Sequence, residues 1–67
     1  IYKVGYGFFN NKGQMMSTEN YDYVQATDSN EQTLLSILNN NNKSRGGLTT
    51  KILSVSNVSQ AQGNVLT

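Results

Sequence analysis

The chain has 67 residues, a formal net charge of +1, and neither cysteine nor histidine. This composition excludes a disulfide framework and a zinc site built from cysteine and histidine, and it leaves self-association as the remaining support for so small a core. A net charge of +1 is also too small to indicate nucleic-acid binding by itself.

Residues 1–9 predict a β-strand in which the even positions are apolar or aromatic and alternate with Lys3, Gly5 and Gly7. The segment Asn10-Asn11-Lys12-Gly13 predicts a three-residue hairpin loop, with Gly13 in the left-handed conformation. A second strand is expected to follow and to run as far as Ala26.

The length of this loop sets the register of the hairpin. A three-residue loop puts Asn10 opposite Gln14, Phe8 opposite Met16 and Tyr6 opposite Thr18, so Tyr2, Val4, Tyr6, Phe8, Val24 and Ala26 share one face. A two-residue loop would instead place the aromatic side chains with Tyr21 and Tyr23. We favour the first register because both the glycine and the sorting of apolar residues agree with it. Residues 17–20 are where the strand would break.

The stretch VGYGFF contains Gly5, Tyr6, Gly7 and Phe8, which resemble half of the RNA-binding sheet motif of RNA-recognition-motif proteins. That resemblance implies a platform on which Tyr6 and Phe8 stack bases. The register instead points these rings toward the helix, and a chain this short needs both for its core. We therefore expect Tyr6 and Phe8 to be core residues, and Gly5 and Gly7 to permit close approach of another backbone on the opposite face.

A helix is predicted to start at Asp28, which would cap it with Glu31 in a capping box, and to end among residues 39–42. Arg45-Gly46-Gly47 predicts a flexible loop. Residues 48–58 predict a third strand, in which Ile52 points one way and Leu53 and Val55 the other. The expected fold is a small α+β domain over residues 1–58 with the element order ββαβ, a mostly antiparallel three-stranded sheet and one helix on one face. Residues 59–67 would be disordered or add an edge strand.

One helix cannot cover both faces of a sheet, so the opposite face is predicted to be exposed. Exposed aromatic residues and methionine are typical of interfaces between proteins. The alternative is that these side chains merely pair across strands or are covered by the C-terminal tail. The candidate partner interface consists of Phe9, Met15, Tyr21 and Tyr23.

The charged residues are segregated, because all four acidic residues lie between positions 19 and 31 and every later charge is positive. The alternative to a functional basic patch is a solvated surface. The candidates for contact with an anion or a nucleic acid are Lys3, Lys43, Arg45 and Lys51.

No residue pattern predicts catalysis, a metal site or a cofactor. We expect a non-catalytic protein-interaction module that self-associates and binds a protein partner; the first alternative is a nucleic-acid-binding module using the basic 43–51 loop and exposed aromatic residues. A second alternative is that the Arg45-Gly46-Gly47 loop holds a nucleotide or small anionic ligand in a cleft of an oligomer. Ten asparagines fit an AT-rich coding sequence, which suggests an accessory or inhibitor protein of a phage or mobile element acting inside a bacterial cell. No apolar run predicts a membrane span.

Overall fold

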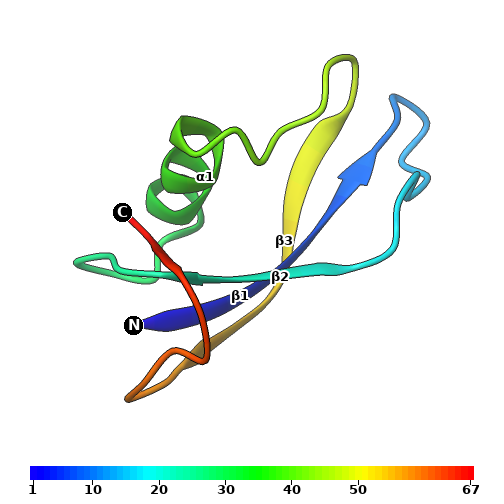
Figure 1. The fold of residues 1–67 in the computed structure, drawn as a ribbon. Coiled ribbons are helices and arrows are strands. Elements are labelled where there is room, and N and C mark those ends of the chain that lie inside the picture. The colour runs from blue at the N-terminus through cyan, green and yellow to red at the C-terminus, as the bar shows by residue number, and fades with distance from the viewer.

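The first strand, β1 (Tyr2–Phe9), is central in the sheet of the computed structural model, which describes residues 1–67. β2 (Asn20–Val24) and β3 (Thr49–Asn57) pair antiparallel with its two sides, and β4 (Val65–Leu66) pairs parallel with β2. The helix α1 (Glu31–Asn40) lies on one face of this sheet (Figure 1). The expected α+β class with one helix on a sheet is confirmed.

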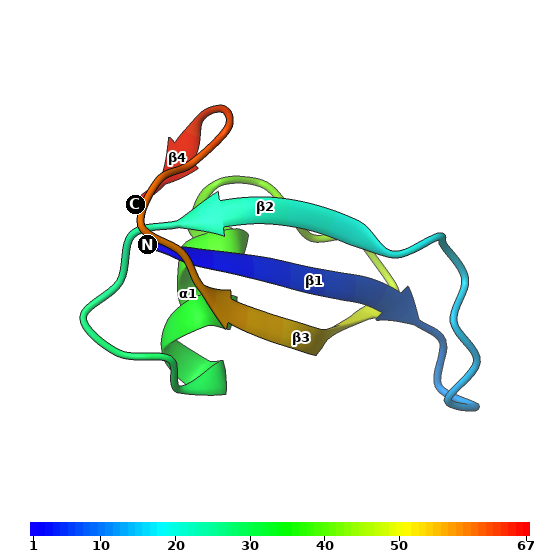
Figure 2. The same cartoon turned by 90° about the horizontal axis from the view of Figure 1, so that it is seen from below.

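The expected three strands are wrong, because the C-terminal segment adds a fourth strand to the sheet of its own chain. The strand order is β3-β1-β2-β4, and the element order is ββαββ (Figure 2). The Gln25 N–H donates to the Leu66 carbonyl at 2.8 Å, and the Asn41 side-chain amide donates to the Thr67 carbonyl at 3.1 Å. The first bond holds the tail beside β2, and the second ties its end to the C-terminal end of α1.

The hairpin loop has the predicted conformation. Gly13 has φ +79°, its N–H donates to the Asn10 carbonyl, and the Asn10 N–H donates to the Gln14 carbonyl. The Asn10 side chain also accepts hydrogen bonds from the N–H groups of Lys12 and Gln14, which braces the loop from within. Glycine adopts this left-handed conformation without the steric cost that a side chain would add.

The register of the hairpin changes once, within the segment where a break was expected. Phe9 pairs with Met15 as predicted, but Tyr6 pairs with Asn20 rather than with Thr18. Between these two pairs, the partner segment moves on by five residues, from 15 to 20, whereas β1 moves back by only three, from 9 to 6. The partner segment therefore contains two additional residues. Since the two additional residues are an even number, β1 and β2 keep the predicted faces.

The core lies between α1 and the even-numbered face of β1 and β2. Tyr6 is 3% exposed and Phe8 4%, so the prediction that they are core residues is confirmed. Their rings meet edge to face, with centroids 5.8 Å apart, a favoured aromatic geometry. The fully buried core side chains are Val4, Val24, Leu34 and Leu38.

The start of α1 corrects the predicted capping box. Asn30 is the N-cap and its side chain makes no capping hydrogen bond, while the side chain of Asp28, two residues earlier, accepts the Asn30 N–H. Asp28 thus stabilises a local turn before α1 and does not cap the N-terminus of the helix. With ten residues, α1 is neither long nor apolar enough to span a membrane.

The C-terminal end of α1 lies within residues 39–42, as predicted. Asn42 has φ +61°, and the next N–H, that of Lys43, donates back to the Leu38 carbonyl at 2.9 Å. This closes the helix with a left-handed residue, a conformation that asparagine tolerates better than most residues.

A bulge in β3 corrects the predicted orientation of its side chains. Gly5 pairs with Ser54 and Tyr6 with Ile52, so Leu53 is an additional residue on β3. Beyond the bulge Val55 pairs with Val4, and it therefore shares the helix-side face with Ile52 instead of pointing away from it.

Candidate interaction surfaces

The sheet face opposite α1, which we call the open face, carries the odd-numbered residues of β1. Figure 2 shows this side of the sheet with α1 lying behind it. Gly5 and Gly7 are buried here although no helix covers them. A Cβ atom on Gly7 would lie 2.8 Å from the Met15 sulfur, and one on Gly5 would collide with Glu19 and Ser54. The close approach expected at these glycines is therefore made by side chains, not by another backbone.

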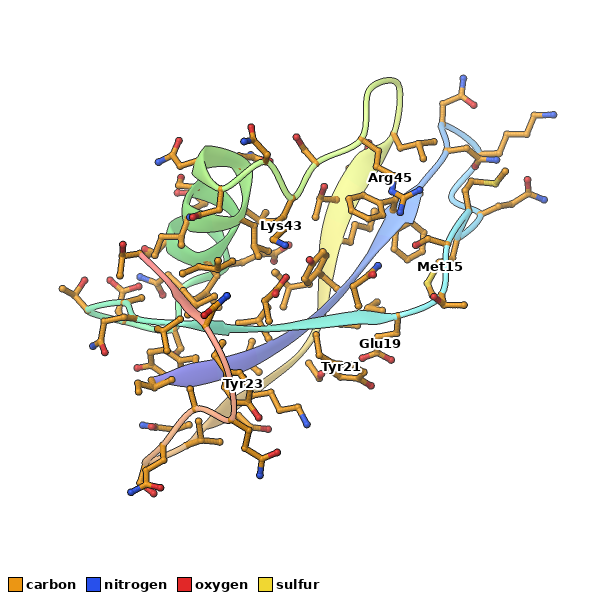
Figure 3. All side chains as sticks on the ribbon, in the orientation of Figure 1. Met15, Glu19, Tyr21, Tyr23, Lys43 and Arg45 are labelled. Carbon is orange, nitrogen blue, oxygen red and sulfur yellow. The ribbon has the colours of Figure 1, made fainter.

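Met15 and Tyr21 form the exposed part of the open face. Met15 is 40% exposed and lies over Gly7, while Tyr21 is 55% exposed and its ring lies beside Gly5. Glu19 lies between them in the chain, and its interaction with the Tyr21 hydroxyl raises the pKa of Tyr21. Figure 3 shows the three side chains following one another along the same part of the sheet.

Phe9 and Tyr23 are half-buried and lie at opposite ends of the open face. Phe9 pairs with Met15, whereas Tyr23 pairs with Val65 of β4. In Figure 3 Tyr23 lies beside the C-terminal strand and Met15 lies toward the hairpin loop, with Tyr21 between them. The structure thus pairs Phe9 with Met15 at one end of the open face, and places Tyr21 and Tyr23 further along β2, opposite Gly5 and Lys3.

Two lysines lie against the aromatic rings of two residues of the candidate partner interface. The Lys3 ammonium is 5.1 Å from the centroid of the Tyr21 ring, and the Lys51 ammonium is 5.0 Å from that of Phe9. Both distances are within the range of a cation–π contact. The open face therefore combines aromatic rings and positive charges with the negative charge of Glu19.

The edge strand β3 displays two further exposed apolar side chains, outside the candidate partner interface. Leu53 and Val55 are both exposed, and the outer side of β3 pairs with no other strand. An unpaired edge of nine residues would accept another strand, but the bulge at Leu53 distorts it. The pattern of Leu53 and Val55 was visible in the sequence; that β3 lies at the edge was not.

Lys43 and Arg45 lie on the other side of the sheet from Lys3 and Lys51. They line an open hollow of about 200 Å³. The guanidinium carbon of Arg45 is 4.9 Å from the centroid of Phe8. The four basic residues proposed as one patch are therefore divided into two pairs. The lining residues are Tyr6, Phe8, Asn20, Asn42, Lys43, Ser44 and Arg45.

The Tyr6 hydroxyl is a buried polar group beside this hollow, and it donates a hydrogen bond to the Asp22 carboxylate. Burial, followed by this bond and the charge of Asp22, raises the pKa of Tyr6, while the charge of Arg45 acts in the opposite direction. Alternation along the strands did predict that Tyr6 and Asp22 share a face. Their contact depends on the register change before β2.

The structure contains no group of three or more acidic residues that could hold a metal ion. No protein-family model, curated protein or solved structure matches this chain.

Proposed function

We propose that the chain is a protein-interaction module that self-associates and binds a protein partner through its open face. The observation that carries this proposal is the exposure of Met15 and Tyr21 on the one face of the sheet that α1 leaves uncovered. A small domain gains stability by covering such a surface with a second chain.

The charges on the open face support a second copy of the chain as one occupant. Along β1 the face presents Lys3, then Glu19 above Gly5, then Lys51 beside Gly7. A two-fold pairing of two such faces would bring Glu19 of one copy toward a lysine of the other. An isologous interface of this kind needs a surface that is complementary to itself.

The test is sedimentation equilibrium over a wide range of protein concentrations, at low and at high salt. We expect an assembly that persists at high salt, because burial of Met15 and Tyr21 does not depend on ionic strength. A chain that stays monomeric at every concentration would contradict self-association.

A matched pair of substitutions locates the interface. Met15→Lys places a charge on the open face, whereas Met16→Lys makes the same change at a neighbour that is 57% exposed and contacts Asn10. We expect Met15→Lys to dissociate the assembly and to lower the melting temperature to that of the dilute, dissociated parent chain, and Met16→Lys to leave both unchanged. Equal effects of the two changes would argue against the open face.

Nucleic-acid binding is the second candidate, favoured by the ammonium groups of Lys3 and Lys51 beside the rings of Tyr21 and Phe9. A surface of this kind binds a single strand through phosphate contacts and stacking. Fluorescence anisotropy with a labelled single-stranded oligonucleotide would show binding that weakens steeply with salt. Binding that is absent at low salt would remove this candidate.

A further inference from the structure

The hollow between the segment after α1 and the sheet lies on the side of the sheet opposite to the open face. Its floor is formed by Tyr6 and Phe8, and residues 42–45 and Asn20 form its walls. In Figure 3 Lys43 and Arg45 lie along the connection from α1 to β3, above the sheet. A ligand here would not compete with a partner on the open face.

The segment that carries the two basic side chains is fixed at both ends. At its start, Asn42 has φ +61° and the Lys43 N–H is bonded to the Leu38 carbonyl. At its end, the Leu48 N–H donates to the Arg45 carbonyl at 3.1 Å, across a turn in which Gly47 has φ +79°. Arg45-Gly46-Gly47 is thus part of a closed turn, and the backbone that carries Lys43 and Arg45 is fixed at both ends without a ligand.

The hollow is lined by hydrogen-bond donors, and the charges around it sum to a positive value. The nearby Asp22 carboxylate already accepts the Tyr6 hydroxyl, and it opposes only one of the two positive charges. The N–H groups of Ser44 and Arg45 donate to no other group of the protein. The Asn42 side-chain amide and the Ser44 hydroxyl supply further donors, while the Asn20 side-chain amide already donates to the Thr18 carbonyl at 3.1 Å.

We propose that this hollow binds a phosphate group, as the free ion or as the end of a phosphate monoester, with Lys43 and Arg45 as its main ligands. A volume of about 200 Å³ is smaller than the pockets that enclose drug-sized molecules, so the phosphate is the recognised part. Because Arg45 already covers the Phe8 ring, that ring offers no stacking surface to a nucleobase. An arginine and a lysine together suit the geometry and charge of a phosphate.

Nuclear magnetic resonance of the ¹⁵N-labelled chain tests this, with inorganic phosphate and glycerol phosphate as separate ligands at constant ionic strength. We expect saturable shifts of the amide signals of residues 42–45. A monoester that binds at least as tightly as the free ion identifies a phosphate carried on a larger molecule, and weaker binding identifies the free ion. Shifts that rise linearly without saturation, or that are as large at Lys12, would overturn the proposal.

Variants separate the charge of Arg45 from its packing on Phe8. Arg45→Gln should weaken phosphate binding about tenfold or more, Arg45→Lys should restore only the part that depends on charge, and Lys12→Gln on the exposed hairpin loop should leave binding unchanged. Binding by Arg45→Gln equal to that of the parent chain would overturn the proposal. A single-stranded oligonucleotide that binds far more tightly than phosphate and shifts Lys3 and Lys51 as well would overturn it in favour of nucleic-acid binding.

Discussion

The two faces of the sheet are built from the same strands but are stabilised in different ways. On the helix side, Tyr6 and Phe8 are almost fully buried under α1 and the segment that follows it. On the open face, Gly5 and Gly7 are buried beneath Met15, Glu19 and other side chains of adjacent strands. The helix-side face is covered by α1 and the segment after it, whereas the open face is covered only by side chains that pack against Gly5 and Gly7.

This difference shows how a chain of 67 residues can use both faces of one sheet. Because Gly5 and Gly7 have no side chains, Met15 and Tyr21 can contact the backbone of β1 while much of each side chain stays exposed. Substitutions of buried residues, on either face, should therefore affect folding, and substitutions of the exposed side chains Met15 and Tyr21 should affect association.

The largest expected effect is that of Tyr6→Ser, which removes a buried ring and the hydroxyl donor of Asp22. Loss of a large core side chain costs about 3–5 kcal/mol, against a total of roughly 3–10 kcal/mol for a domain of this size. We expect the variant to be unfolded or close to it by circular dichroism. Tyr21→Ser is the matched change on the open face and should leave a cooperative thermal transition; the reverse ranking would refute the assignment of the two faces.

A smaller effect is expected for a methyl group added on the open side of β1. Gly5→Ala would push against Glu19, Ser54 and Tyr21 at once, and we expect a loss of about 1–3 kcal/mol in urea unfolding. Gly7→Ala should cost less, because the end of the flexible Met15 side chain can move away. Gly46→Ala is the control, since no atom lies within 4 Å of its Cβ position. Equal midpoints for Gly5→Ala and Gly46→Ala would show that side chains do not pack on Gly5.

The smallest effect distinguishes the hydroxyl of Tyr6 from its ring. Tyr6→Phe should cost about 1 kcal/mol at neutral pH, through loss of the bond to Asp22. The raised pKa of Tyr6 means that the folded chain keeps a proton that the unfolded chain releases near the ordinary value of 10.0. Its contribution is therefore complete below that pH and declines above it, by at most about 1.4 kcal/mol per pH unit.

Urea unfolding between about pH 9 and about pH 11 measures this decline. We expect the parent chain to lose stability more steeply than Tyr6→Phe over this range, because the variant has no group to titrate at this position. Parallel pH profiles for the two chains would contradict a hydroxyl that is buried and bonded to a carboxylate.

Much of the fold follows from short-range patterns that are visible in the sequence. Alternation along residues 1–9 predicts which rings enter the core, Gly13 predicts the hairpin loop, and the asparagine run predicts where α1 ends. Of the candidate interface, Phe9 and Met15 were predicted as a pair and do pair. These features depend on neighbours in the chain or on the period of a strand, so the residues themselves carry the information.

The remaining features depend on contacts between segments that are distant in sequence. The slip of two residues before β2, the bulge at Leu53 and the pairing of Val65 with Tyr23 all arise where one strand meets another. The separation of the basic residues into two pairs has the same origin. Lys51 lies on the open face because of its position in β3, whereas Lys43 and Arg45 lie in the segment after α1, on the other side of the sheet. The sequence by itself determined the core face of the sheet and the ends of its local elements. The tertiary structure decided what covers the open face and what surrounds the hollow, because both are formed by side chains that only folding brings together.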